Sequence, residues 1–341
     1  MKALVYLGPN QMEYKDVADV TPKADEVKVD VKSCGICGSD VHGYLGLTGR
    51  RTEPMAMGHE FSGQVSEVGG GVKSFKPGDR VAVYPVDFCG ECDMCGQGQY
   101  QLCKDKRQFG VLEVDGAFAD SICVPEKCCF PLKEDVSFDI ASLVEPFAVA
   151  LHGVRHAGDV AGKNVLVVGA GTIGLLALSS LKLLGAGKVI VSDINETRLG
   201  VAKAMGADET VNPTVGDFEQ NIAGMTGGKG ADIAIEAVGS AITVQQASKA
   251  LRFGGTAIWL GNNKPMIEMN MQEVVTREQK VYGSFLYTLD DFRQVIEWIN
   301  AGKANVDALV SKTAPMSEGV FYFEKLAHDP EDLIKVVLTN E

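Results

Sequence analysis

Four cysteines in the first third of the chain place the strongest constraint on its fold. They are Cys89, Cys92, Cys95 and Cys103. Thiolates at this spacing can converge on one tetrahedral ion, and zinc held by four thiolates has no open position, so the pattern predicts a structural zinc lobe over about residues 87–104. An iron–sulfur cluster is the alternative. Its fourth cysteine usually comes sooner and precedes proline, whereas Lys104 follows here.

Bulk composition narrows the possible functions. The chain has 341 residues, enough for two domains, and 45% of them are hydrophobic. The formal net charge of −13, with no Lys/Arg-rich block, argues against nucleic acid as a partner. No apolar run is long enough for a membrane span, and the first residues do not read as a signal peptide. Nine cysteines, mostly at metal-like spacings, predict a reducing, cytoplasmic location instead of a disulfide scaffold.

The hydrophobic pattern changes near residue 153. Before it, short alternating runs such as 26–31 and 80–83 are separated by Gly and Pro turns, which is typical of half-buried antiparallel strands. After it, short apolar strands such as 165–168 alternate with helical segments such as 175–184. This alternation predicts an α/β region with a doubly wound parallel sheet. A final strand is expected at 333–338, and periodicity does not say which domain it joins.

A glycine-rich turn follows the first strand of the second region. Gly169, Gly171 and Gly174 fit the pattern G-x-G-x-x-G, and Thr172 and Ile173 open the helix. Such glycines allow a tight turn, close approach of a pyrophosphate and close packing of helix on strand, while the helix N-terminus offers free N–H groups to the anion. A plain tight turn is the alternative. Because strand, turn and helix come in the required order, the pattern predicts a dinucleotide site.

An acidic residue completes the dinucleotide signal. Asp193 stands at the end of the second strand, about 20 residues beyond the turn. A carboxylate there accepts hydrogen bonds from the adenosine ribose and repels a 2′-phosphate, which favours NAD over NADP. A helix N-cap is the alternative role for Asp193. Arg198, on the next helix, weakens the preference for NAD.

A second candidate metal group precedes the cysteine lobe. Cys37 lies in the segment Cys-Gly-Ile-Cys-Gly-Ser-Asp, and His59 and Glu60 are adjacent in the sequence. A thiolate, an imidazole and a carboxylate form a borderline-soft donor set that suits zinc and leaves a position open for water or substrate. A lone cysteine and a His–Glu pair are more often ordinary residues, so the spacing alone leaves this group a hypothesis.

In this order, the elements resemble the zinc-dependent medium-chain dehydrogenase/reductase family. The resemblance covers essentially the whole chain, and it rests on the four-cysteine lobe and on segments 37–42, 58–60, 145–146 and 169–174. It implies an α/β protein with a GroES-like, β-rich catalytic domain and a Rossmann domain. It also implies two zinc ions per subunit, one structural and one catalytic, with the catalytic zinc in a cleft between the domains.

The resemblance also assigns the domains and the assembly. The implied catalytic domain spans residues 1–153 and 288–341, and the implied Rossmann domain spans 154–287. Relatives form homo-oligomers, commonly by joining Rossmann sheets edge to edge, and a tetramer is favoured over a dimer. The strand near 281–285 is the expected edge.

Site residues are carried over by position. The resemblance makes Cys37 and His59 zinc ligands and Glu60 a third or an exchangeable ligand. Glu145 stands where ethanol-type alcohol dehydrogenases have a second cysteine, so the chain departs from that branch and resembles the polyol branch, in which a carboxylate can bind the metal directly or through water. The expected catalytic metal ligands are therefore Cys37, His59, Glu60 and Glu145.

Two residues near Cys37, Ser39 and His42, match the family's proton relay, and a third, Asp40, matches a residue that supports the metal site. Ser39 falls where a hydroxyl lies close to the zinc-bound oxygen of the alcohol, and the resemblance implies that the proton passes outward from it, via the cofactor ribose, to His42. Asp40 matches a carboxylate that holds the imidazole of His59 in its ligating tautomer. Non-catalytic roles are the alternatives: Ser39 and Asp40 could cap a helix, and His42 could be a solvated surface residue.

The implied reaction is reversible oxidation of a secondary alcohol of a polyol to a ketone, with hydride transfer to NAD. Arg50 and Arg51 are expected either to recognise a phosphate, which would make the substrate a polyol phosphate, or to be solvated. L-Threonine 3-dehydrogenase and 2,3-butanediol dehydrogenase activities are the alternatives within the family. A non-catalytic zinc-binding interaction protein is the alternative from another class.

Overall fold

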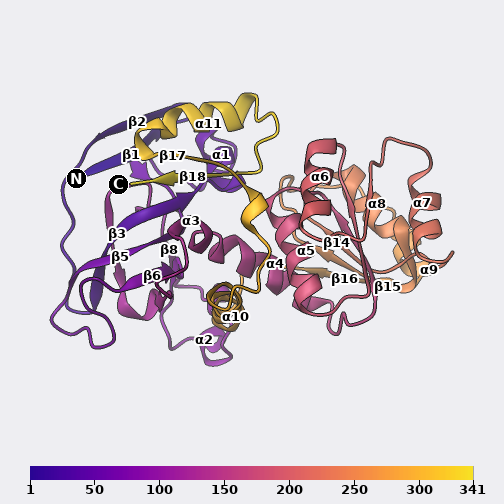
Figure 1. Ribbon diagram of the computed structural model, residues 1–341, viewed down its shortest axis with the longest axis horizontal. Coiled ribbons are helices and arrows are strands. Elements are labelled where there is room, and N and C mark those ends of the chain that lie inside the picture. The colour runs from indigo at the N-terminus through magenta and orange to yellow at the C-terminus, as the bar shows by residue number, and fades with distance from the viewer. Residues whose placement is uncertain (341) are drawn as a thin grey trace. The chain divides into compact units, whose positions relative to one another are not determined.

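The computed structural model describes residues 1–340, which pack as two compact units (Figure 1). The first unit comprises Met1–Glu145, Thr288–Gly302 and the chain from Val310 onward, and the second comprises Pro146–Tyr287 and Lys303–Leu309. Segments 146–153 and 303–309, which the resemblance gives to the catalytic domain, thus pack with the second unit.

The first unit is built on β-sheets of mainly antiparallel strands. Its largest sheet has the order β10-β6-β5-β3-β18-β17, and β9 also pairs with β3. A second sheet has the order β2-β1-β4, and β7 pairs with β8. The strands are β1 (Lys2–Gly8), β2 (Gln11–Asp16), β3 (Glu26–Gly35), β4 (Met55–Ala56), β5 (Glu60–Val68), β6 (Arg80–Val83), β7 (Val86–Asp87), β8 (Arg107–Gln108), β9 (Ser121–Pro125), β10 (Cys129–Pro131), β17 (Val310–Pro315) and β18 (Lys335–Thr339).

Alternation along β3 explains how the large sheet forms. Val27, Val29 and Val31 are buried in the core, while the residues between them are less buried. A strand with this period covers a core on one face, as the sequence predicts. The late strand β18 pairs with β3 in antiparallel register, so the tail whose place periodicity left open belongs to the first unit's sheet.

Short helices accompany the first unit's sheets. They are α1 (Gly38–Tyr44), α2 (Asp93–Gly96), α3 (Phe138–Ala141), α10 (Leu289–Asn300) and α11 (Gly319–His328), with short 3-10 turns at Tyr100–Leu102, Glu126–Cys128 and Met316–Glu318. Helix α10 begins at a capping box of Thr288 and Asp291 and buries Phe292, Val295 and Ile299 along one face. That spacing is the apolar stripe of an amphipathic helix.

The second unit confirms the predicted doubly wound parallel sheet. Its strand order is β13-β12-β11-β14-β15-β16, and every pair is parallel. The strands are β11 (Asn164–Val168), β12 (Lys188–Ser192), β13 (Glu209–Val211), β14 (Ala231–Glu236), β15 (Leu251–Trp259) and β16 (Lys280–Gly283). The helices are α5 (Thr172–Leu183), α6 (Glu196–Ala204), α7 (Phe218–Met225), α8 (Ala241–Ala250) and α9 (Met271–Thr276), with a 3-10 turn at Asp307–Leu309.

The strand order indicates where a ligand is expected to bind in the second unit. The chain moves outward from β11 through β12 to β13, and then returns to the other side of β11 with β14. In open α/β sheets, ligands bind beyond the carboxyl ends of the strands at such a switch point. Helix α4 (Val144–His156) crosses the division between the units.

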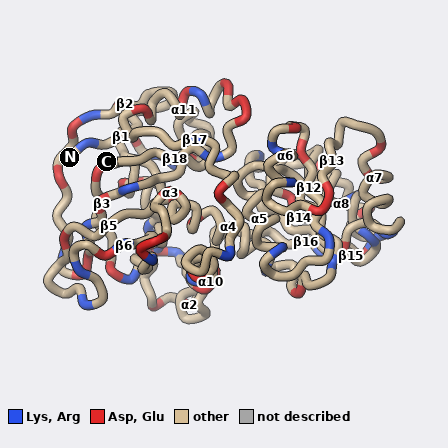
Figure 2. Tube along the Cα trace, viewed as in Figure 1, with Lys and Arg blue, Asp and Glu red and all other residues tan. Residues whose placement is uncertain are grey.

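Charges are interspersed on both units, with acidic and basic residues close together along the chain (Figure 2). In this view, neither unit gathers its Lys and Arg residues into one stripe. Among residues 1–340, no helix combines the length and apolarity that a membrane crossing requires.

Candidate metal centres and dinucleotide site

The turn between β3 and α1 presents Cys37. This residue is the N-cap of α1: its Sγ accepts the N–H of Ser39, and Oδ2 of Asp40 accepts the N–H of Cys37 at 3.3 Å. The hydroxyl of Ser39 also donates to Sγ of Cys37 at 3.3 Å. The helix cap is therefore formed by Cys37 and Asp40, and the alternative in which Ser39 caps the helix is wrong. The hydroxyl of Ser39 instead lies directly beside the candidate ligand.

His59 and Glu60 stand at the start of β5, and both are buried. Their ligand atoms and the Sγ of Cys37 all lie within 4.8 Å of one another. Gly58, just before them, has φ +95°, and a Cβ there would lie 2.9 Å from Sγ of Cys34 and from the N of Phe118. The chain thus needs glycine where it turns His59 and Glu60 toward Cys37.

The chemistry of these three donors fits zinc. One thiol, one imidazole and one carboxylate converge, which is a set of N, S and O donors with a position to spare. Nδ1 of His59 lies 3.4 Å from Oδ1 of Asp40, so Nε2 is the nitrogen left for a metal. The Nδ1 contact does not reach hydrogen-bond geometry, although the two groups lie within ion-pair distance.

Glu60 has a buried cationic partner that the sequence analysis missed. Nζ of Lys335, on β18, lies 2.5 Å from Oε2 of Glu60 and donates to the carbonyl of Ile36 at 2.9 Å. The Lys335 side chain is 2% exposed. Burial lowers the pKa of Lys335, but the charges of Glu60 and Cys37 outweigh it, and the pKa lies above its usual value. Nothing in the local sequence could reveal a partner that comes 275 residues later.

Asp40 has a buried cationic partner as well. Nη2 of Arg51 donates to Oδ1 of Asp40 at 2.8 Å, and both side chains are buried. Burial raises the pKa of Asp40, but the charges of His59 and Arg51 and the hydrogen bond from Arg51 outweigh it and lower the pKa to about 2. For Arg51, the expectation of a phosphate contact or a solvated side chain is wrong, because its guanidinium is committed to Asp40. Arg50 is exposed.

The remaining predicted catalytic residues are not part of the converging group of Cys37, His59 and Glu60. Glu145 is buried in the first turn of α4, and its carboxylate is not among the three donors that lie within 4.8 Å of one another. Ser39 and His42 are three residues apart on α1, so they share one face of the helix. Ser39 is exposed and His42 is half-buried.

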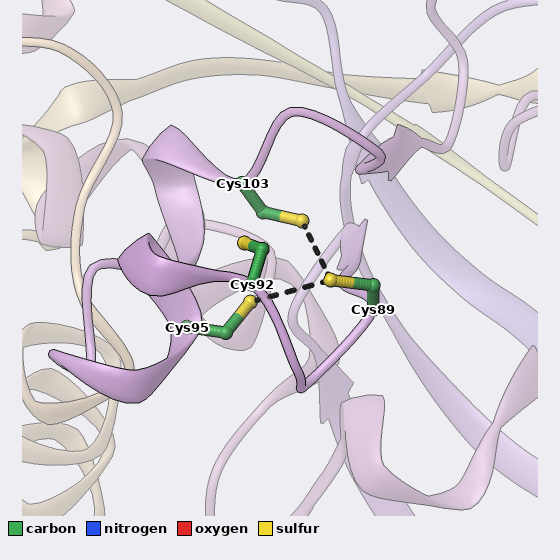
Figure 3. Close-up of side chains that lie close together, drawn as sticks. All are labelled: Cys89, Cys92, Cys95 and Cys103. Carbon is green, nitrogen blue, oxygen red and sulfur yellow. Dashed lines mark hydrogen bonds between the residues drawn. The ribbon is translucent and has the colours of Figure 1, made fainter.

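The four lobe cysteines also converge (Figure 3). Sγ of Cys89 lies 3.5 Å from Sγ of Cys103 and 3.9 Å from Sγ of Cys95, and all four sulfur atoms lie within 4.8 Å of one another. Gly90, with φ +83°, turns the chain between Cys89 and Cys92, and Cys92 is the N-cap of α2. An all-sulfur donor set fits a closed tetrahedral zinc site.

Protonation differs within the lobe. A hydrogen bond from the backbone of Cys95 lowers the pKa of Cys92 to about 7, whereas burial raises the pKa of Cys95 to about 12. A thiolate at Cys92 is therefore available near neutral pH, and a metal would have to displace the proton of Cys95.

The three glycines of the dinucleotide turn play three separate roles. Gly169 has φ +103°, and a Cβ there would meet Cγ2 of Val238 at 2.6 Å. Gly171 is the N-cap of α5 and has no heavy atom within 4 Å of a built Cβ, so a ligand can approach its backbone. A Cβ at Gly174 would lie 1.8 Å from the carbonyl oxygen of Gly169, so the helix packs closely on the turn. These are the roles that a pyrophosphate site requires.

Asp193 ties this turn to the end of β12. Its Oδ2 accepts the N–H of Ala170 at 2.7 Å, and its Oδ1 accepts the N–H of Asn195 at 2.9 Å. The N-cap of α6 is Asn195, whose side chain accepts the N–H of Arg198, so the N-cap alternative for Asp193 is wrong. Arg198 is half-buried on α6, and its Nε is buried without a hydrogen bond.

Comparison with known proteins identifies relatives of the whole chain. Residues 23–134 match the alcohol dehydrogenase GroES-like domain, and residues 172–301 match the zinc-binding dehydrogenase domain. The chain is 32% identical to the sorbitol dehydrogenase of Bacillus subtilis over 99% of its own length and 97% of the relative. It is 37% identical to a probable D-xylulose reductase A of Aspergillus niger, over 95% and 93% of the two chains.

Solved structures of the same architecture carry the cofactor. A putative zinc-binding dehydrogenase of Sinorhizobium meliloti bound to NADP superposes with a TM-score of 0.93 at 32% identity, covering 99% of each chain. An alcohol dehydrogenase of Escherichia coli complexed with NADH gives 0.92 at 31%, covering 100% and 99%. Galactitol-1-phosphate dehydrogenase of Escherichia coli gives 0.93 at 28%, covering 100% of both.

These matches span both units, and with them the predicted α/β class, the GroES-like and Rossmann domains and the dependence on zinc and a nicotinamide cofactor are confirmed. The chain belongs to the zinc-dependent medium-chain dehydrogenase/reductase family.

Proposed function

We propose that this protein oxidises a secondary alcohol of a polyol to a ketone with NAD as hydride acceptor. The observation that carries the proposal is the convergence of Cys37, His59 and Glu60 within 4.8 Å, in a chain similar to sorbitol dehydrogenase and D-xylulose reductase. In this proposal, the first unit is the catalytic domain and the second unit binds the dinucleotide.

The reaction needs a Lewis acid, a hydride acceptor and a route for one proton. Zinc held by Cys37, His59 and Glu60 would lower the pKa of the alcohol, and NAD would accept the hydride as the carbon becomes a ketone. The chain's own part is proton movement: the Ser39 hydroxyl, beside Cys37, takes the alcohol proton, and His42, one helical turn further on, passes it to water.

Carboxylates distinguish this site from that of an ethanol-type enzyme. We assign Glu145 as a further oxygen donor, acting on the metal directly or through water. A polyol offers two vicinal oxygens, which suits an oxygen-richer site containing Glu60 and Glu145. Replacing Glu145 by Cys should reduce the preference for polyols over simple alcohols, and an unchanged preference would contradict this role.

The choice of NAD rests on Asp193. Its carboxylate stands at the end of β12, where the ribose of the adenosine would lie, and it repels a 2′-phosphate. One similar structure holds NADP and another holds NADH, so the family accommodates both. Replacing Asp193 by Ser should improve the kcat/KM ratio of NADP to NAD by about tenfold, or ~1.4 kcal/mol. An unchanged ratio would mean that another group selects between NAD and NADP, and Arg198 would be the first residue to test.

A polyol phosphate is the second candidate substrate. Exposed Arg50 could contact a phosphate, and galactitol-1-phosphate dehydrogenase has the same architecture. L-Threonine and 2,3-butanediol are alternatives that the same chemistry accepts. A non-catalytic zinc-binding role would leave both the Ser39–Cys37 contact and the glycine turn without a use.

Assembly and location complete the proposal. Strand β16 ends the second unit's sheet, and all four of its residues are exposed, so it offers an unpaired edge to a second copy. We propose a homo-oligomer, a tetramer over a dimer, in the cytoplasm. Sedimentation of the purified protein tests the assembly.

The deciding experiment measures NADH formation at mildly alkaline pH with zinc-loaded protein. The panel holds sugar alcohols, polyol phosphates, 2,3-butanediol, threonine and ethanol, each with and without a chelator, and NADP serves as the cofactor control. We expect chelator-sensitive activity on polyols. No turnover of any secondary alcohol, in protein shown to hold metal and cofactor, would refute the proposed function.

A further inference from the structure

Arg51 is a buried cation whose backbone is anchored from two sides. Its side chain is 4% exposed. The carbonyl of Arg50 accepts the N–H of Leu112 at 2.9 Å, and the N–H of Thr52 donates to the carbonyl of Leu112 at 3.4 Å. Leu112 belongs to the segment that leaves the cysteine lobe after β8. These contacts hold the backbone of Arg51 in place, so its side chain starts from a fixed point.

The guanidinium reaches Asp40 through a gap that glycine leaves open. A Cβ at Gly43 would lie 2.7 Å from Cγ of Arg51 and 3.2 Å from its Nε. Nη2 donates to Asp40 at 2.8 Å and Nη1 donates to the carbonyl of Arg50 at 3.1 Å, while Nε is buried without a hydrogen bond. A buried cation with an unsatisfied N–H reduces stability relative to an apolar side chain of similar size. Packing alone therefore does not account for this arginine.

Asp40 touches two of the three metal donors. Its Oδ2 accepts the N–H of Cys37, and its Oδ1 lies 3.4 Å from Nδ1 of His59. The same Oδ1 accepts the hydrogen bond from Arg51. One carboxylate thus sits between Cys37, His59 and Arg51, and its position sets the orientation of both donors.

We propose that Arg51 is a positioning residue of the metal site. Its guanidinium fixes the Asp40 carboxylate, which in turn fixes Cys37 and the Nδ1 side of His59 so that Nε2 faces the metal. Groups that orient a ligating imidazole affect metal affinity about 10- to 100-fold. This inference rests on the proposed function, in which Cys37, His59 and Glu60 bind zinc.

The test measures Co²⁺ binding, because the visible absorption of Co²⁺ reports its ligand geometry. Protein is stripped of metal, the lobe is refilled with one equivalent of zinc, and the remaining site is titrated with Co²⁺ in competition with a chelator. We expect Arg51→Met to weaken Co²⁺ binding about 10- to 100-fold and to change the absorption band, whereas Arg51→Lys keeps most of the affinity. Arg50→Met is the matched control, because this neighbouring arginine is exposed, and it should bind as the unaltered protein does.

A double substitution separates action through Asp40 from general damage. If Arg51 acts by fixing the Asp40 carboxylate, then Arg51 should have little effect on metal binding in the Asp40→Asn protein, which lacks that carboxylate. The affinity of the Asp40→Asn, Arg51→Met protein should then lie within about threefold of that of Asp40→Asn alone. Losses that multiply would show that Arg51 acts by another route and would overturn the proposal.

Further outcomes are also decisive. If Arg51→Met does not fold, Gly43→Ala replaces it, because the added methyl group displaces the arginine without removing it, and we expect weaker Co²⁺ binding there too. Unchanged affinity and absorption in folded Arg51→Met or Gly43→Ala overturn the inference while leaving the proposed function intact. Failure of the unaltered protein to bind Co²⁺ outside the lobe would refute the proposed metal site itself.

Discussion

The two candidate metal centres lie in the same unit and are built in opposite ways. The lobe takes all four donors from one short segment, Cys89 to Cys103, and its sulfur atoms face one another (Figure 3). The other centre takes Cys37 from the start of α1 and His59 and Glu60 from the start of β5, and it is surrounded by the buried charges of Asp40, Arg51 and Lys335.

The difference follows from what each centre has to do. Four thiolates complete the shell of a zinc ion, so a lobe can close on its metal with few other groups. A centre that leaves a position for substrate has fewer donors of its own, so other residues must hold those donors in place. The buried ion pairs around Cys37, His59 and Glu60 are what this division of roles predicts.

The largest expected effect is the loss of turnover on removing a reactive-site donor. His59→Ala should lower kcat for polyol oxidation by about 10³-fold or more, because Lewis-acid activation supplies several kcal/mol. Steady-state NADH formation measures it. Cys103→Ala, in the lobe, is the matched control and should keep its kcat per folded molecule. Equal losses in the two variants would contradict the division between the centres.

Breaking the Lys335–Glu60 pair should destabilise the first unit. Lys335→Met leaves a buried carboxylate without its cation, which costs about 3–5 kcal/mol. Urea unfolding of the metal-free protein measures the loss. Adding Glu60→Gln removes the unpaired charge and should restore part of the stability. A change below about 0.5 kcal/mol in Lys335→Met would show that water or another group already compensates Glu60.

Emptying the lobe should have a smaller and more local effect. Cys95→Ala removes one of four sulfur donors, and we expect a loss of about 2 kcal/mol and a Tm lower by about 4–8 °C. Hydrogen exchange should rise in segment 89–103 and remain unchanged around Cys37 and His59. Faster exchange at the reactive centre would show that the two centres are coupled, through the contact of Leu112 with Arg50 and Thr52.

The smallest effect concerns pH. In metal-free protein the pKa of Cys92 is about 7 and that of Cys95 is about 12. Because the thiolate is the reactive form, alkylation of Cys92 should rise about tenfold per pH unit below pH 7 and level off above it, while Cys95 stays unreacted up to pH 9. Peptide mass spectrometry follows both. Zinc should protect both thiols, and labelling of Cys95 before Cys92 would contradict the assignment.

Sequence reasoning identified what is encoded by local spacing. The strand at 165–168, the glycine turn after it and the cysteine lobe all appear where expected, because each depends on neighbours within a few residues. The convergence of Cys37 with His59 and Glu60 needed the family resemblance, since spacing alone is weak there.

Local sequence patterns could not predict contacts between residues far apart in the chain. Lys335 meets Glu60 across 275 positions, and a lone lysine in an apolar strand carries no local sign of its partner. Arg51 was misinterpreted because two adjacent arginines in a polar loop usually face solvent. The sign that could have corrected this is Gly43, which leaves room for a long side chain against α1.

The pairing of β18 with β3 has a consequence for the order in which the protein is made. Strand β3 and the residues Cys37, His59 and Glu60 leave the ribosome early, but their sheet partner and the cation Lys335 come after the whole second unit. The parallel sheet can therefore fold during synthesis while the first unit still lacks a central strand. Until β18 arrives, the edge of β3 that it covers is open to a wrong partner. Glu60 lacks its ion-pair partner, Lys335, until the last part of the chain has been synthesised.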